Sequence, residues 1–113
     1  MDDVGAGDST RVVAISGELD SSNVKKLRMQ IDEPCARLVL DLSGLTFIDS
    51  AGAAALLAVR RALAADGRTL VIVLPSGTKA YRLLKMLRLT RTLPLVESLD
   101  AACERLATPG ATS

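Results

Sequence analysis

Two adjacent polar residues, Asp49 and Ser50, stand where the sequence changes from one kind of structure to another. The apolar segment 46–48 precedes them, and from 53 to 65 almost every residue is Ala, Leu or Val. Such an alanine-rich tract predicts a helix, which Gly67 is well placed to cap at its C-terminus. Polar side chains at the start of a helix lie beside its unpaired N–H groups. We therefore expect the Ser50 hydroxyl to be either a helix cap or a site of chemistry.

The rest of the sequence offers little for catalysis. There is no histidine and there are only two cysteines, so Ser–His–Asp and Cys–His arrangements and zinc sites of the usual kind cannot form within the chain. Phosphate-binding loops, dinucleotide-binding turns and nucleophile elbows are also absent. The acidic pairs Asp2-Asp3 and Asp32-Glu33 are typical of solvated surface. We expect no catalytic residue, no metal and no cofactor, and hence a protein that is not an enzyme.

Composition points to one domain with an aliphatic core. The 113 residues are 49% hydrophobic, yet the only large aromatic residues are Phe47 and Tyr81. Modules that stack nucleic-acid bases on aromatic side chains are therefore disfavoured. With 14 basic and 13 acidic residues the formal net charge is +1, which indicates no strongly charged partner for the protein as a whole.

The sequence favours a cytoplasmic location. Residues 1–5 are acidic where a secretory signal would be basic, and no apolar run reaches the length of about 18–20 residues that a membrane span needs. Cys35 and Cys103 would then be reduced, each a small apolar residue in or near the core. A redox pair is the alternative.

The expected elements alternate between strand and helix. We expect a flexible lead-in over 1–10, in which 3–6 could form a weak edge strand, a domain over 11–107 and a disordered tail over 108–113. Apolar patterns predict strands at 12–17, 38–42, 46–48, 70–74 and 93–96. Helices are predicted from Ser22 to before Pro34, over 53–65, over 80–87 with Ser76 as cap, and from Ser98 through Leu106, while 18–23 reads as a turn. This alternation indicates right-handed crossovers in a mainly parallel sheet.

Two motifs give the chain a resemblance to a known family. Gly17-Glu18-Leu19-Asp20 ends the first expected strand, and the run from Asp41 to Gly52, DLSGLTFIDSAG, leads into the apolar helix. Both resemble the bacterial anti-sigma factor antagonists built on the STAS domain, and the likeness covers about residues 11–107. The spacing of the segments 67–70 and 89–90 also matches this family. The resemblance implies a single α/β STAS domain, with a small mixed, mostly parallel β-sheet and helices mainly on one face.

The resemblance also implies a function. In that family the serine directly after the aspartate is phosphorylated by an anti-sigma factor that is itself a serine kinase, and only the dephosphorylated form binds the anti-sigma factor and frees the sigma factor. The matching residue is Ser50. Ala51 and Ala53-Ala54 depart from the family, where Ser or Thr and Leu-Gly are common. The implied partners are an anti-sigma factor and, as a further candidate, a phosphatase, without direct nucleic-acid contact or membrane insertion.

A partner surface is expected at the start of the alanine-rich helix and the turn before the first helix. Its small side chains would let a partner backbone approach closely, although about half of the alanines must pack on the sheet. A phosphate on Ser50 would place about −1.5 to −2 charges in the middle of this surface. The predicted partner-binding residues are Glu18, Asp20, Ser21, Ser22, Asp49, Ala51, Gly52, Ala53 and Ala54.

Two alternatives stay open. The segment between Gly67 and Val96 has no acidic residue, and its cations Lys79, Arg82, Lys85 and Arg88 flank an apolar stripe. They could bind an acidic partner or anionic lipid, or form a solvated helix face. The same fold also serves as the accessory subunit of a lipid-transporting ABC system, where it binds the ATPase.

Overall fold

The main sheet of the molecule has four parallel strands. The structure is a computed structural model that describes residues 9–29 and 32–107. Residues 1–8 of the lead-in expected at 1–10, and the tail expected at 108–113, lie outside the described residues, while β1 already begins at Thr10. Every strand pairing among the described residues is parallel, where the sequence predicted a mostly parallel sheet. The sheet has the order β1-β3-β5-β6, formed by β1 (Thr10–Ala14), β3 (Arg37–Asp41), β5 (Thr69–Val73) and β6 (Leu95–Val96).

A second, two-stranded sheet corrects one expectation. Residues 18–23 were predicted as a turn, but β2 (Gly17–Leu19) pairs in parallel with β4 (Leu45–Ile48). Gly17, the first residue of β2, adopts a positive φ of 81°, and its carbonyl accepts a hydrogen bond from the Thr46 hydroxyl at 2.9 Å. The strand forms because Leu19, which is 1% exposed, is buried in the core beside Ile48.

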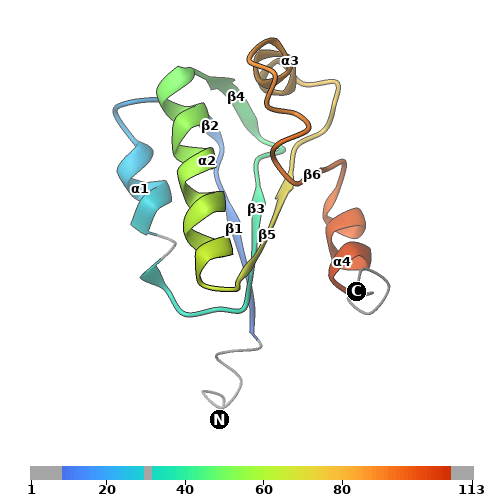
Figure 1. Ribbon diagram of the computed structural model, residues 1–113. Helices are drawn as coiled ribbons and strands as arrows, with labels where there is room; N and C mark the ends of the chain where they lie inside the picture. Colours follow the sequence, from blue (N-terminus) through green and yellow to red (C-terminus); the bar gives the residue numbers. More distant parts are fainter. Residues whose placement is uncertain (1–8, 30–31, 108–113) are drawn as a thin grey trace.

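The helices cover the main sheet unequally (Figure 1). Leu38, Leu40 and Ile72 belong to the larger core, which contains the buried side chains of the two helices on one face. Val39 and Val71 point to the other face of the sheet. There they form a smaller core with Ala102, which belongs to the one helix described on that face. The predicted arrangement, with helices mainly on one face, is confirmed. The helices are α1 (Val24–Met29), α2 (Ser50–Ala65), α3 (Lys79–Met86) and α4 (Leu99–Ala107), of which α1 and α2 share the first face.

The end of α2 follows the sequence prediction. Gly67 has a positive φ of 73° directly after the C-cap residue Asp66. Its N–H donates to the Ala64 carbonyl at 3.0 Å, and the Arg68 N–H donates to the Leu63 carbonyl at 2.8 Å. These two bonds are the pattern of a Schellman motif, in which glycine is favoured because it has no Cβ.

The predicted cap of α3 was wrong by two residues. The cap is Thr78, whose hydroxyl oxygen accepts a hydrogen bond from the Tyr81 N–H at 3.1 Å. Ser76 lies too early to reach the first turn, because α3 begins only at Lys79. Its N–H donates to the Glu97 carboxylate at 3.2 Å instead.

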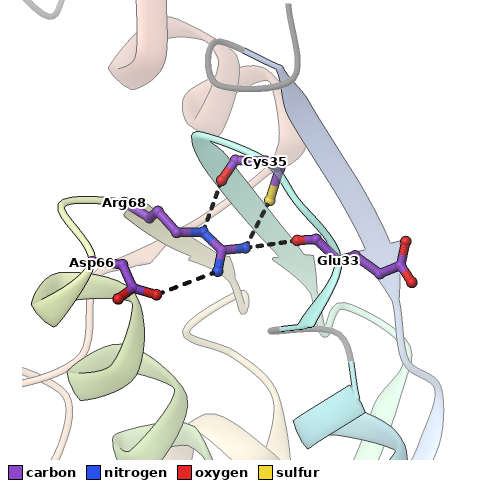
Figure 2. A network of polar contacts seen from close by, with 4 residues as sticks. All are labelled: Glu33, Cys35, Asp66 and Arg68. Atoms are coloured by element: carbon purple, nitrogen blue, oxygen red, sulfur yellow. Dashed lines mark hydrogen bonds and ion pairs between the residues drawn. The ribbon is translucent and has the colours of Figure 1, made fainter. Parts of the chain in front are cut away.

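Arg68 joins the segments that lead into β3 and β5 (Figure 2). Its guanidinium donates to the carbonyls of Cys35 and Glu33, each at 2.8 Å, and to the Cys35 sulfur at 3.3 Å. The Asp66 Oδ2 lies 3.9 Å from the Arg68 Nη1, which makes a long ion pair. Cys35 is buried in the larger core as predicted. Cys103 is exposed on α4, which corrects the expectation that it lies in or near the core, and both thiols are free.

The cluster around Arg68 lies beyond the C-terminal end of α2. Ser50 is at the other end of this 16-residue helix, about 24 Å away along the axis at 1.5 Å per residue. In the described part of the chain, no helix is both long and apolar enough to cross a membrane.

Candidate functional site

Ser50 is the first residue of α2 and is exposed, but it does not cap the helix. The cap is Asp49, whose Oδ1 accepts a hydrogen bond from the Gly52 N–H at 2.8 Å. The interpretation of Ser50 as a helix cap is therefore wrong. No hydrogen bond of its hydroxyl to another described residue is present. The hydroxyl is thus available for chemistry at the positively polarised end of a helix.

The two segments predicted to bind a partner lie side by side. The pairing of β2 with β4 sets Leu19 opposite Ile48, and the Asp49 N–H donates to the Leu19 carbonyl at 3.3 Å. Gly52 allows this approach, because a Cβ at this position would lie 2.3 Å from the Leu19 oxygen and 2.8 Å from Cγ1 of Ile48. The start of α2 is therefore held directly against the end of β2.

The turn after β2 is stabilised by its own side chains. The Asp20 carboxylate accepts hydrogen bonds from the Ser22 hydroxyl at 2.6 Å and from the Ser22 N–H at 3.0 Å. Asn23 accepts from the Asp20 N–H at 2.9 Å and donates to the Glu18 carbonyl at 2.6 Å. The bond from the Ser22 hydroxyl, followed by that from its N–H, lowers the pKa of Asp20, against a smaller opposing effect of desolvation. Asp20 is therefore a carboxylate at neutral pH.

Burial divides the nine predicted partner-binding residues. Gly52 and Ala53 are buried, the latter 2% exposed, so neither presents a side chain to a partner. They support the surface from inside, as was expected for about half of the small residues. Accessible to a partner are the exposed residues Glu18, Ser21, Ser22 and Ala54 and the half-buried Asp20, Asp49 and Ala51. Partner binding by these seven residues stays a prediction.

A groove beside Ser50 was missed by the sequence analysis. It has a volume of about 240 Å³ and lies between the β4–α2 junction and α3. Three apolar side chains in it are exposed to solvent, namely Met86 at 77%, Leu87 at 45% and Phe47 at 37%. We call it the α3 groove; its lining residues are Phe47, Ile48, Asp49, Ser50, Leu83, Met86 and Leu87.

Leu87 shows why sequence reasoning overlooked this groove. The helical spacing of 80, 83, 84 and 87 placed Leu87 with the inward-facing residues. The structure ends α3 at Met86, and Leu87 is the exposed C-cap residue. A signal was nevertheless present, because Met86 is a large apolar residue outside the inward-facing set.

Comparison with known proteins identifies the family. The family model described as "Mlab, STAS domain" matches residues 3–103, most of the chain. The chain belongs to the STAS-domain family. An anti-sigma F factor antagonist from Paenibacillus polymyxa is 32% identical to this STAS domain over 92 residues, which are 77% of this chain and 78% of the relative.

Two solved structures share the fold of this STAS domain. The anti-sigma factor antagonist SpoIIAA in its unphosphorylated form matches with a TM-score of 0.69 and 23% identity, over 88% of this chain and 89% of that one. A sulfate transporter family protein from Wolinella succinogenes matches with a TM-score of 0.66 and 16% identity, over 80% and 79% of the two chains. The predicted STAS fold is confirmed.

The helix that borders the α3 groove of this STAS domain carries only positive charges. Lys79, Arg82 and Lys85 are exposed on α3, and Arg88 follows directly after Leu87. The sequence between Gly67 and Val96 contains no acidic residue to offset them. Asp49 contributes a carboxylate on the opposite wall, where it is already bonded to the Gly52 N–H. The groove is therefore lined by apolar side chains together with Asp49 and Ser50, and the helix on one side of it carries exposed cations.

Proposed function

We propose that this protein is an anti-sigma factor antagonist, which binds an anti-sigma factor when Ser50 is unmodified and releases it when Ser50 is phosphorylated. The observation that carries the proposal is the exposed Ser50 hydroxyl at the start of α2, left free because Asp49 caps the helix. The name of the relative from Paenibacillus polymyxa supports the choice of partner. The chain acts here as a binding protein and not as an enzyme.

Phosphate at Ser50 suits this site chemically. The first N–H groups of α2 and the helix dipole favour an anion there, and the first turn of the helix contains no acidic residue. The same anion would stand next to Asp49 and in the wall of the α3 groove. A partner docked over this surface would meet an unfavourable charge of about −1.5 to −2. A loss of about 2.8 kcal/mol of binding free energy is enough for a hundredfold lower affinity.

The switch leaves the fold intact, because the Ser50 side chain has no structural bond to lose. We expect Ser50→Ala to keep the fold and the binding, and Ser50→Asp to keep the fold and lose the binding. Ser98 offers a matched control. Its hydroxyl accepts a hydrogen bond from the Ala101 N–H at 3.1 Å at the start of α4, a bond that an aspartate there can also accept. Ser98→Asp therefore adds the same charge at another helix start without removing a cap.

Phosphorylation itself tests the proposal. The purified protein is incubated with ATP and a candidate anti-sigma kinase encoded near its gene, and its intact mass is measured. One phosphate is expected on the wild type and on Ser98→Asp, and none on Ser50→Ala. A phosphate on Ser50→Ala, or undiminished binding of the anti-sigma factor by the Ser50→Asp variant, would refute the switch.

The second candidate function is the accessory subunit of a lipid-transporting ABC system. The description of the matched family model, Mlab, names no sigma-factor regulator, which favours testing this alternative. The two functions differ in the protein that the chain binds. Co-purification with a transporter ATPase, and with no kinase-like protein, would support the second candidate.

A further inference from the structure

The apolar lining of the α3 groove is unusual in being both exposed and next to Ser50. Phe47 and Ser50 flank the β4–α2 junction, while Met86 and Leu87 come from the end of α3. Exposed apolar side chains that gather around a hollow mark a site of interaction. The groove therefore extends the surface at Ser50 from α2 across to α3.

Helical spacing shows which α3 cations border this groove. Residues three or four positions apart are neighbours on a helix surface. Lys79 lies four positions before Leu83, and Arg82 lies four positions before Met86, so each adjoins a groove-lining residue. Lys85, in contrast, has no groove-lining residue three or four positions away on either side. Lys85 thus provides an internal control for the two others.

The backbone at Arg88 provides an independent observation. Arg88 has a φ of 61° and is the only non-glycine residue with a positive φ in the described part of the chain. The Arg88 N–H donates to the Lys85 carbonyl at 2.9 Å and the Leu89 N–H donates to the Leu84 carbonyl at 3.0 Å. This is the same pattern of bonds that ends α2 at Gly67.

An arginine at this position needs an explanation. The left-handed conformation is unfavourable for a residue with a Cβ, and α2 uses glycine for the same task. Strained backbone positions of this kind cluster at functional sites. An arginine in this conformation is therefore a candidate for a functional role. Arg88 is exposed and directly follows the groove-lining Leu87 in the chain.

We propose that the α3 groove binds an acidic amphipathic segment of the protein partner. The apolar side of the segment packs on Phe47, Met86 and Leu87, and its carboxylates face Lys79, Arg82 and Arg88. The inference rests on the proposed function in that the partner of the Ser50 surface is a protein. A protein segment fits the observations better than a lipid surface, because the apolar side chains line a hollow between two elements and not a protruding face.

The charge of the segment links the groove to the switch. Ser50 lines the groove on the side of the β4–α2 junction, and α3, which carries the cations, forms the other side. A phosphate there repels the carboxylates of the segment and offers the cations a competing anion. Release of the partner then follows from charge at the groove, without a change of fold.

The test uses the purified full chain and two synthetic amphipathic peptides, one with Leu and Glu faces and one with Leu and Lys faces. Amide resonances are followed by NMR during titration. The Glu peptide is expected to shift the amide resonances of Phe47, Leu83, Met86 and Leu87. Its binding is expected to weaken as the salt concentration is raised. Equal binding of the Lys peptide, or shifts that avoid these residues, would overturn the proposal. Binding only to vesicles of phosphatidylcholine and phosphatidylglycerol would assign the surface to lipid and overturn it as well.

Variants locate the binding. We expect about tenfold weaker binding of the Glu peptide, a difference of about 1.4 kcal/mol, in two variants. One is the double variant Arg82→Glu/Arg88→Glu, and the other is Met86→Ser. Lys85→Glu is expected to change the affinity for the Glu peptide by less than about twofold, because Lys85 lies away from the groove. All four substituted side chains are exposed, so the variants should fold, and circular dichroism checks this. An equal loss in Lys85→Glu would contradict the proposal.

The same variants separate this inference from the proposed function. If an anti-sigma factor binds under control of Ser50 but ignores Arg82→Glu/Arg88→Glu, the groove proposal is wrong and the proposed function stands. If the Glu peptide binds in the groove and no anti-sigma factor binds, the proposed function is wrong and the groove proposal stands.

Discussion

Gly52 and Leu19 are in such close contact that no side chain fits between them. A Cβ on Gly52 would lie 2.3 Å from the Leu19 carbonyl oxygen, well inside any normal contact distance. This contact fixes the start of α2 against the end of β2. The relative position of Ser50 and the turn after β2 therefore depends on a glycine at this place.

The first prediction concerns this contact. Gly52→Ala should destabilise the fold by about 1–3 kcal/mol, because the clash involves backbone and a buried Ile48 side chain that cannot move away freely. Gly77→Ala is the matched control, since a Cβ there meets nothing within 4 Å and its φ is not positive. Urea denaturation measures both. Equal stability of the Gly52→Ala variant and the wild type would contradict the close approach.

The second prediction separates the roles of Asp49 and Ser50. Asp49→Ala removes the cap of α2 and should cost about 0.5–2 kcal/mol of unfolding free energy, whereas Asp49→Asn should retain most of the stability. Ser50→Ala should stay within about 0.5 kcal/mol of the wild type, because it is an exposed position without a bond to lose. Thermal or urea denaturation gives these values. A larger loss in Ser50→Ala than in Asp49→Ala would reverse the assignment of the cap.

The third prediction concerns Arg88. Arg88→Gly should raise the stability by about 0.5–1 kcal/mol, because the left-handed backbone costs an arginine roughly 1–2 kcal/mol and glycine's greater freedom in the unfolded chain offsets part of the gain. The same variant should bind the partner more weakly. Arg82→Gly should instead destabilise the fold, because Arg82 lies within α3 and glycine is a poor helix former. A loss of stability in Arg88→Gly would show that the conformation is not strained.

The fourth prediction is a pH dependence. The pKa of Asp20 in the folded protein lies below its ordinary value of 3.8, chiefly because of the Ser22 hydroxyl. A lowered pKa stabilises the fold at pH values above the ordinary one, and this contribution is lost as the pH falls through the folded-state pKa. Ser22→Ala should move the pKa of Asp20 back toward 3.8, and the neighbouring Ser21→Ala should not. An NMR titration of the carboxyl carbon that finds equal pKa values in the two variants would contradict this role of Ser22.

The strongly patterned elements were predictable from sequence. The apolar runs at 38–42 and 70–74 became β3 and β5, and the alanine-rich tract became α2. In each case a single physical preference extends over many residues. The end of α2 at Gly67 was predictable for a similar reason, because the helix formers stop and a residue without Cβ follows.

Other features depend on contacts between distant segments. β2 has only three residues and one apolar side chain, Leu19, and it exists because it pairs with β4. The α3 groove exists because α3 packs against β4, a contact that the spacing of residues within α3 does not encode. Thr78 and Ser76 are both good caps by residue type, and only the position at which α3 begins decides between them.

The central claim is that charge at Ser50 controls docking of an anti-sigma factor. The most direct measurement is the affinity of the purified protein for that factor, by isothermal titration calorimetry, before and after phosphorylation of Ser50. We predict at least about a hundredfold weaker binding of the phosphorylated form, with the affinities of Ser50→Ala and Ser98→Asp close to that of the unmodified protein. Equal affinity of the two forms, with the phosphate verified on Ser50 by mass spectrometry, would contradict it.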